Sequence, residues 1–181
     1  MKLSLSIFAL MIMLSGCLRK DVVEENSNEL ITTLRLKFTE QGSNTASIFQ
    51  FRDVDGPGGE TPQVDTIRLK ANTSYSVEAE ILDESKDPVV DIHGEVEEEG
   101  TVHRLYLIPS AGIDITITEL DYDSEGHPLG LKSNWQTGNA AQGRVTVTLR
   151  HYENGGKESS DPVNSTKSNT DAEVVFLVIS Y

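Results

Sequence analysis

From residue 30 onward, apolar and polar residues alternate along most of the chain. This two-residue period is typical of β-strands that bury one face. It is clearest in the segments 34–38, 75–81, 113–117 and 145–149, and further strands are predicted at 47–52, 65–70, 103–108, 129–137 and 174–180. The pattern predicts an all-β domain over residues 30–181, folded as an antiparallel β-sandwich of about eight or nine strands.

Two segments in the last third of the chain depart from this alternation. The segment 174–180, VVFLVIS, is apolar at nearly every position, as expected of a central strand that is buried on both faces. The segment 153–171 is long, polar and without aromatic residues. Because such a composition offers little apolar surface to bury, it favours disorder.

One short helix is predicted at 87–100. Asp87 would cap it, Pro88 would take its first position and Gly100 would end it. The apolar side chains that would share one face are Val89, Ile92 and Val96. Gly94 and the acidic C-terminal end of the segment weaken this helix, so we expect it to be marginal.

The N-terminal residues MKLSLSIFALMIMLSGC combine a basic start with an apolar run that is too short to span a membrane. The sequence LSGC at 14–17 resembles the bacterial lipobox, in which Cys17 is lipidated and becomes the mature N-terminus. We therefore predict a lipoprotein signal peptide at 1–16 and a lipidated, flexible tether at 17–29. The chain would be anchored in the cell envelope, on either face of the outer membrane. The alternative is an ordinary signal peptide that happens to precede a cysteine.

Composition narrows the chemistry of the domain. The chain has 29 acidic and 15 basic residues, which give a formal net charge of -14. Such a charge repels phosphate backbones, so no nucleic-acid partner is expected. Cys17 is the only cysteine, and its lipidation would exclude disulfides, cysteine nucleophiles and cysteine-based zinc sites.

Two acidic loops are candidate cation sites, because Ca²⁺ prefers several carboxylate and carbonyl oxygens around a tight turn. One loop lies at 51–60 and the other at 121–130, DYDSEGHPLG. The candidate ligands are Asp53, Asp55, Asp121, Asp123 and Glu125. A complete coordination shell would require the two loops to meet.

An EF-hand is excluded for the second loop, because its twelfth position is Lys132 instead of a glutamate and because its flanks are predicted strands. The alternative for both loops is a simple turn, in which Asp and Gly serve the backbone geometry. The sequence leaves these two interpretations open.

No catalytic motif is present in the sequence. There is no G-x-S-x-G motif, no H-E-x-x-H motif and no phosphate-binding glycine loop. The four histidines, His93, His103, His127 and His151, have no recognisable ligand spacing. Glu99 and His103 would form half of a zinc site only if the helix continued, and His103 is predicted to lie in a strand. We therefore expect a protein that is not an enzyme, with no catalytic residues.

Several segments together resemble a family of short Bacteroidetes lipoproteins that carry the label "type 1 periplasmic binding fold superfamily protein". The segments that carry the resemblance are ITT at 31–33, RDVDG at 52–56, ANTSY at 71–75, DYDSEGHPLGL at 121–131 and GRVTVTLRH at 143–151. The fold in that label is an α/β protein of two lobes, whereas the alternation here predicts strands without crossover helices. The resemblance implies a setting beside TonB-dependent outer-membrane receptors.

Two functions follow from these observations. The first is a lipid-anchored binding or accessory protein of the cell envelope that assists a TonB-dependent outer-membrane uptake system. The alternative is a β-sandwich module that binds calcium or another cation through the acidic loops.

Overall fold

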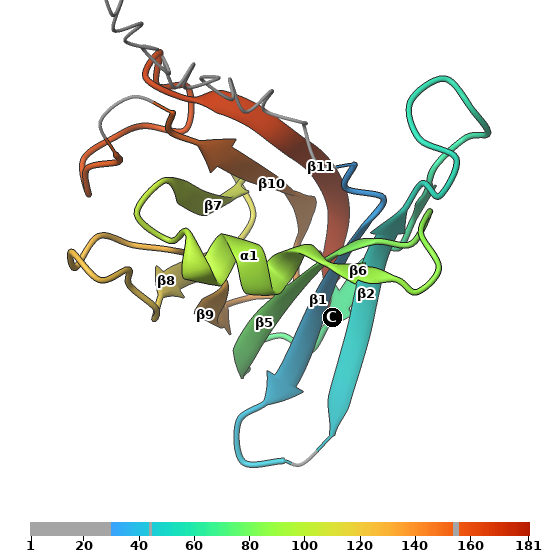
Figure 1. Ribbon diagram of the computed structural model, residues 1–181. Coiled ribbons are helices and arrows are strands. Elements are labelled where there is room, and N and C mark those ends of the chain that lie inside the picture. The colour runs from blue at the N-terminus through green and yellow to red at the C-terminus, as the bar shows by residue number, and fades with distance from the viewer. Residues whose placement is uncertain (1–29, 44, 154–155) are drawn as a thin grey trace, which may run out of the picture.

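The structure is a computed structural model that describes residues 30–43, 45–153 and 156–181. Its strands form two sheets that face each other across one core (Figure 1). The predicted signal peptide at 1–16, Cys17 and the predicted tether at 17–29 lie outside the described residues. Within the described part of the chain, no helix has the length and apolar character needed to cross a membrane.

The first sheet has seven strands. Its order is β3-β2-β1-β5-β9-β8, and β6 pairs with β5 beside this path. The strands are β1 (Thr33–Glu40), β2 (Ala46–Arg52), β3 (Gln63–Val64), β5 (Ser74–Asp83), β6 (Val90–Asp91), β8 (Ile115–Glu119) and β9 (Lys132–Thr137).

The second sheet has the order β4-β11-β10-β7. Its strands are β4 (Ile67–Leu69), β7 (His103–Pro109), β10 (Gln142–His151) and β11 (Asn169–Ser180). Strand β11 is parallel to β4, and every other pair of named strands is antiparallel. The predicted all-β fold is confirmed, and each of the nine predicted strands has a counterpart. The two-residue strands β3 and β6 were not predicted.

The core lies between the sheets and is built from the apolar phase of each strand. Trp135 of β9 is fully buried, and its ring meets the ring of Phe38 in an edge-to-face contact at 5.0 Å. The indole Nε1 donates a hydrogen bond to Ser133 Oγ at 3.0 Å, so burial leaves no unpaired donor on the ring. Phe176 and Val147 complete this layer from the opposite sheet.

Helix α1 (Ile92–Glu98) lies between β7 of one sheet and β5 of the other in Figure 1. Ile92 and Val96 are buried as predicted, but the predicted start at Asp87 is wrong. Because Val90–Asp91 pairs with β5 as strand β6, the helix begins after that strand, and Val89 stays 53% exposed.

Strand β11 also differs from its prediction. Val174, Phe176 and Val178 are buried in the core, whereas Val175 on the opposite face is 46% exposed. The outer face of β11 is therefore not covered by another layer of the described chain, although its residues are apolar.

The loop between β10 and β11, predicted to be disordered, packs against the domain in its described part. Tyr106 Oη, on the outer face of β7, donates a hydrogen bond to the carbonyl oxygen of Asp161 at 2.9 Å and contacts Tyr152 Oη at 2.6 Å. Lys157, only 2% exposed, donates hydrogen bonds to the carbonyl oxygens of Gly100 and His103. Polar side chains anchor this loop in place of apolar ones.

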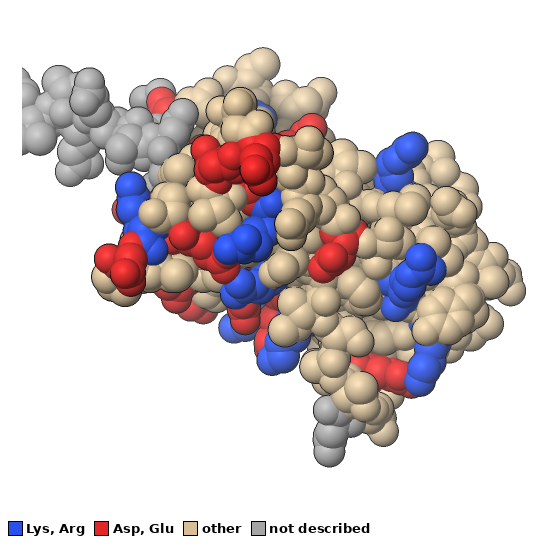
Figure 2. All heavy atoms as spheres, turned by 90° about the vertical axis from the view of Figure 1, so that its right-hand side faces the viewer, with Lys and Arg blue, Asp and Glu red and all other residues tan. Residues whose placement is uncertain are grey.

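Acidic and basic side chains lie beside one another on the face shown in Figure 2. On the outer face of the first sheet, Lys37 pairs with Glu78 at 3.1 Å. Glu84, whose side chain is 12% exposed, accepts hydrogen bonds from Arg52 at 2.5 Å and from Arg35. The bond from Arg52 is the main reason why the pKa of Glu84 lies below its ordinary value of 4.5.

The low pKa of Glu84 predicts a pH-dependent contribution to stability. A carboxyl whose pKa is lower in the folded state stabilises the protein above the unfolded pKa, and this stabilisation is lost as the pH falls through the folded pKa. The melting temperature of the protein is expected to exceed that of Glu84→Gln at pH 7. The difference should narrow below about pH 4.5. A difference that stays constant down to pH 2 in thermal melts would contradict this assignment.

Candidate metal centre

His103 and His151 face each other across neighbouring strands. Strands β7 and β10 pair in a register that places His151 directly opposite His103. Both residues continue the inward phase of their strands, which includes Leu105 and Leu149. Side chains at directly opposed positions are close enough to touch. The two imidazole rings have centroids 4.5 Å apart.

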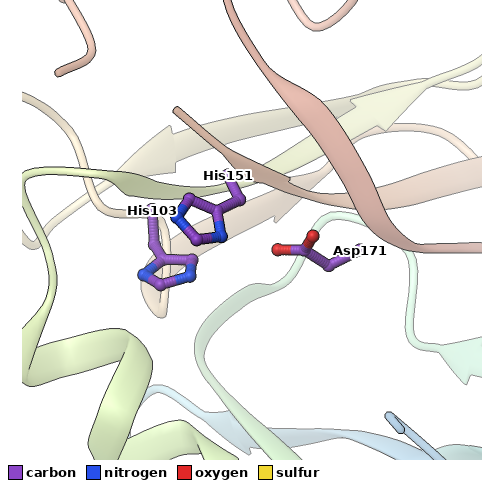
Figure 3. A group of neighbouring side chains, drawn as sticks. All are labelled: His103, His151 and Asp171. Carbon is purple, nitrogen blue, oxygen red and sulfur yellow. The ribbon is translucent and has the colours of Figure 1, made fainter. Parts of the chain in front are cut away.

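Asp171 reaches the same place because of a β-bulge. Leu149 pairs with Ala172, but Arg150 pairs with Thr170, so Asp171 is an extra residue in β11. Regular alternation would put Asp171 on the face opposite Val174, whereas a bulge re-aims side chains locally. Figure 3 shows its carboxylate directed toward the two imidazole rings.

The three side chains form a group with metal-ligand geometry. One ligand atom from each of His103, His151 and Asp171 lies within 4.8 Å of the other two. Among the residues that the structure describes, this is the one group of three or more His, Cys, Asp or Glu side chains that could hold a metal ion. Small rotations of three side chains would bring such atoms to the roughly 2 Å bonds that zinc makes with nitrogen and oxygen.

The orientation of His103 is fixed by the backbone. Its Nδ1 lies 3.3 Å from the carbonyl oxygen of Glu99, at the end of α1. Because a carbonyl oxygen can only accept a hydrogen bond, this contact places the ring proton on Nδ1 and leaves Nε2 with its lone pair. Metal-binding histidines usually have a second ring nitrogen that donates in this way.

The lowered pKa of His103 favours its neutral imidazole, the form that binds a metal ion. Burial, and then the neighbouring His151, lower the pKa of His103 to about 4. Burial raises the pKa of the Asp171 carboxyl, although the neighbouring His151 and Arg150 partly oppose this shift. A bound cation would stabilise the ionised carboxylate, which burial disfavours.

Two imidazole nitrogens and one carboxylate oxygen are a ligand set for transition metals. Imidazole suits zinc, copper, nickel and iron, whereas calcium and magnesium take oxygen ligands. Three protein ligands leave at least one coordination position for water or another small molecule.

The first predicted loop keeps its acidic residues near each other but uses them within the loop. Asp55 accepts a hydrogen bond from the backbone N–H of Glu60 at 2.6 Å, and this bond is the main reason why its pKa lies below its ordinary value. Burial and the neighbouring Asp55 raise the pKa of Asp53. This loop follows β2 and lies at the upper right of Figure 1.

The second predicted loop connects β8 to β9, at the left of Figure 1. Asp123 accepts hydrogen bonds from the backbone N–H groups of Glu125 and His127, both at 2.9 Å, and forms an ion pair with Lys157 at 3.2 Å. Asp121 accepts a hydrogen bond from the N–H of Gly130 at 3.0 Å. The two predicted loops do not meet, so the structure does not form the shared five-residue cation site. Binding of a cation by either loop alone stays a prediction.

The sequence contained part of the signal for the cluster. His103 and His151 both fall in the inward phase of predicted strands, but periodicity does not say which strands pair or in which register. Asp171 was placed in a polar loop, and only the bulge turns it toward the histidines. Glu99 and His103 are in contact, but His103 contacts the backbone carbonyl oxygen of Glu99 and not its carboxylate.

A surface groove of about 510 Å³ lies elsewhere, beside β5 and α1. Its lining includes Glu78, Leu82, Asp91, His93 and Lys132, and none of the three cluster residues.

No protein-family model, curated protein or solved structure matches this chain.

Proposed function

We propose that this chain is a lipid-anchored protein of the cell envelope whose β-sandwich binds one divalent transition-metal ion through His103, His151 and Asp171. The observation that carries the proposal is the convergence of these three side chains within 4.8 Å from three different strands. The backbone contact that orients His103 supports it independently.

The proposal is limited to ion binding, which the three ligands of the cluster support by themselves. The groove beside β5 is a separate feature and does not include the cluster. Water would complete the coordination of an ion bound by three protein ligands. The two imidazole ligands also distinguish this site from the calcium site predicted for the acidic loops, because calcium prefers oxygen ligands.

Zinc titration tests this function. The protein is expected to bind one Zn²⁺ in isothermal titration calorimetry, and Co²⁺ is expected to give visible absorption bands when it enters the same site. His151→Ala or Asp171→Asn should weaken binding by more than about 100-fold, because loss of outer-shell partners alone already weakens metal sites by 10–100-fold. His93→Ala and His127→Ala are matched controls and should bind Zn²⁺ normally.

The same titrations distinguish the two candidate sites. A large excess of Ca²⁺ should not displace Zn²⁺ from the cluster. If His151→Ala and Asp171→Asn both keep full affinity while Asp55→Asn or Asp121→Asn lose it, the cluster is not the site. The acidic loops would then be favoured.

The cellular setting is proposed from the sequence at residues 14–17. A fatty-acid label supplied to cells should be incorporated into the protein and should be absent from Cys17→Ala. Label that persists in Cys17→Ala would remove the anchor from the proposal. An anchored ion-binding domain suits a binding or accessory role in the envelope.

A further inference from the structure

The outer face of β11 is apolar although the described chain covers it only in part: Leu177 and Ile179 are half-buried, and Val175 and Tyr181 are exposed. Val175, Leu177, Ile179 and Tyr181 alternate with the buried residues of the strand and therefore point outward. Val175 is 46% and Tyr181 68% exposed. Ile108 of β7, 40% exposed, extends the apolar surface, because Thr146 of β10 is the register partner of both Ile108 and Val175.

Arginines gather on the same side of the second sheet. Of the six arginines in the described residues, four occupy outward positions of this sheet: Arg68, Arg104, Arg144 and Arg150. The loop between β10 and β11 engages two of them, since Ser159 and Ser165 accept hydrogen bonds from Arg104 and Arg150.

The other two arginines flank the apolar residues. Arg144 is the register partner of Leu177, and Arg68 is the register partner of Ile179. Both are exposed, and neither forms an ion pair with any residue that the structure describes. Glu173, which accepts a hydrogen bond from Thr148, is an exposed carboxylate at the Val175 end of the same face. In a chain with a formal net charge of -14, the part of this surface around Leu177 and Ile179 is therefore locally basic.

We propose that this surface, the β11 face, binds a protein partner that presents apolar side chains flanked by carboxylates. The β11 face comprises Ile108, Val175, Leu177 and Ile179 with Arg68 and Arg144. Arginine is enriched at protein interfaces, where lysine and glutamate are depleted, and the buried centre of an interface is more apolar than its rim. The planar guanidinium groups of the two arginines suit bidentate pairing with carboxylates. The inference does not depend on the metal centre.

Two other occupants fit the β11 face less well. A second copy of this chain would have to pack sheet on sheet about a two-fold axis. A two-fold axis that crosses the strands at Arg144 would stack this residue on its own copy. An axis along β11 would bring Arg144 of one copy toward Arg68 of the other. An anionic bilayer would gain only about 1 kcal/mol from each arginine while it repelled the remaining acidic surface.

Site-specific photo-cross-linking tests the β11 face in cells that produce the full chain. A benzophenone amino acid would replace Val175 and, as the control, Thr116, which is exposed on the outer face of the first sheet. We expect a protein cross-link from position 175 with a yield at least tenfold above that from position 116. The cross-linked peptide of the partner should contain Asp or Glu beside apolar residues.

Charge reversal makes the test specific. Arg144→Glu should lower the cross-link yield at position 175 at least tenfold, and Arg144→Lys should restore part of it. Because Arg144 is exposed, neither change should move the melting temperature. The proposal would be overturned by a cross-link to a second copy of this chain or to phospholipid. It would also be overturned by equal yields at the two positions or by no cross-link at all. A cross-link yield that Arg144→Glu does not change would overturn it as well.

Discussion

Replacement of Asp123 by alanine is expected to lower the free energy of unfolding by about 3–5 kcal/mol, because it leaves a buried ammonium group without its counter-ion. The side chains of Asp123 and Lys157 are 1% and 0% exposed, and their charged atoms lie 3.2 Å apart. Burial lowers the pKa of Lys157, and Asp123 opposes this shift. Urea denaturation would measure the loss of stability.

Two controls separate the effect of burial from the effect of charge. Glu78→Ala removes an exposed ion pair with Lys37 and should change stability by about 0–1 kcal/mol. The double variant Asp123→Leu with Lys157→Met removes both buried charges and should be more stable than Asp123→Ala. An Asp123→Ala variant that unfolds within about 1 kcal/mol of the parent protein would show that the pair does not stabilise the fold.

The second large effect is expected for Gly130→Ala. Gly130 has a φ of +88°, and an added Cβ atom would lie 2.0 Å from the carbonyl oxygen of Leu105. The β7 backbone would have to move, although Leu105 N–H donates a hydrogen bond to the carbonyl oxygen of Leu129 at 2.8 Å. We expect Gly130→Ala to lower the free energy of unfolding by about 3 kcal/mol or more, because steric overlap adds to the left-handed backbone strain.

Gly126→Ala is the matched control for this glycine. Gly126 has a similar φ of +83°, but no atom lies within 4 Å of an added Cβ. Gly126→Ala should therefore lower the free energy of unfolding only by the cost of the left-handed backbone conformation, about 1–2 kcal/mol. Equal losses in the two variants, measured by urea denaturation, would show that the close approach to β7 is relieved without loss of stability.

The two-residue period predicted the fold well because it reports directly which face of each strand is buried. Leu34, Leu36 and Phe38 are buried as their alternation predicts. The helix was predicted to begin too early, because Asp87 and Pro88 satisfy local capping rules but pairing of Val90 with β5 is a tertiary effect. Local signals therefore predicted the elements better than their ends.

The candidate metal centre could not be predicted because it depends on register. His103 and His151 are far apart in the sequence and become neighbours only through the pairing of β7 with β10. The acidic loops were a reasonable hypothesis, since Asp and Gly serve turns and cation sites equally well. Composition could not show that Lys157 would form an ion pair with Asp123. Lys157 belongs to the loop whose composition predicts disorder.

The position of β11 has a consequence for the timing of folding. This strand follows every other described strand in the chain, yet it lies between β4 and β10 and supplies Phe176 to the core. The parallel pair with β4 joins residues more than a hundred positions apart. Such distant contacts form late, because a long loop must close before they contribute stability. The second sheet therefore cannot close before β11 has been made, because β4 joins this sheet only through β11.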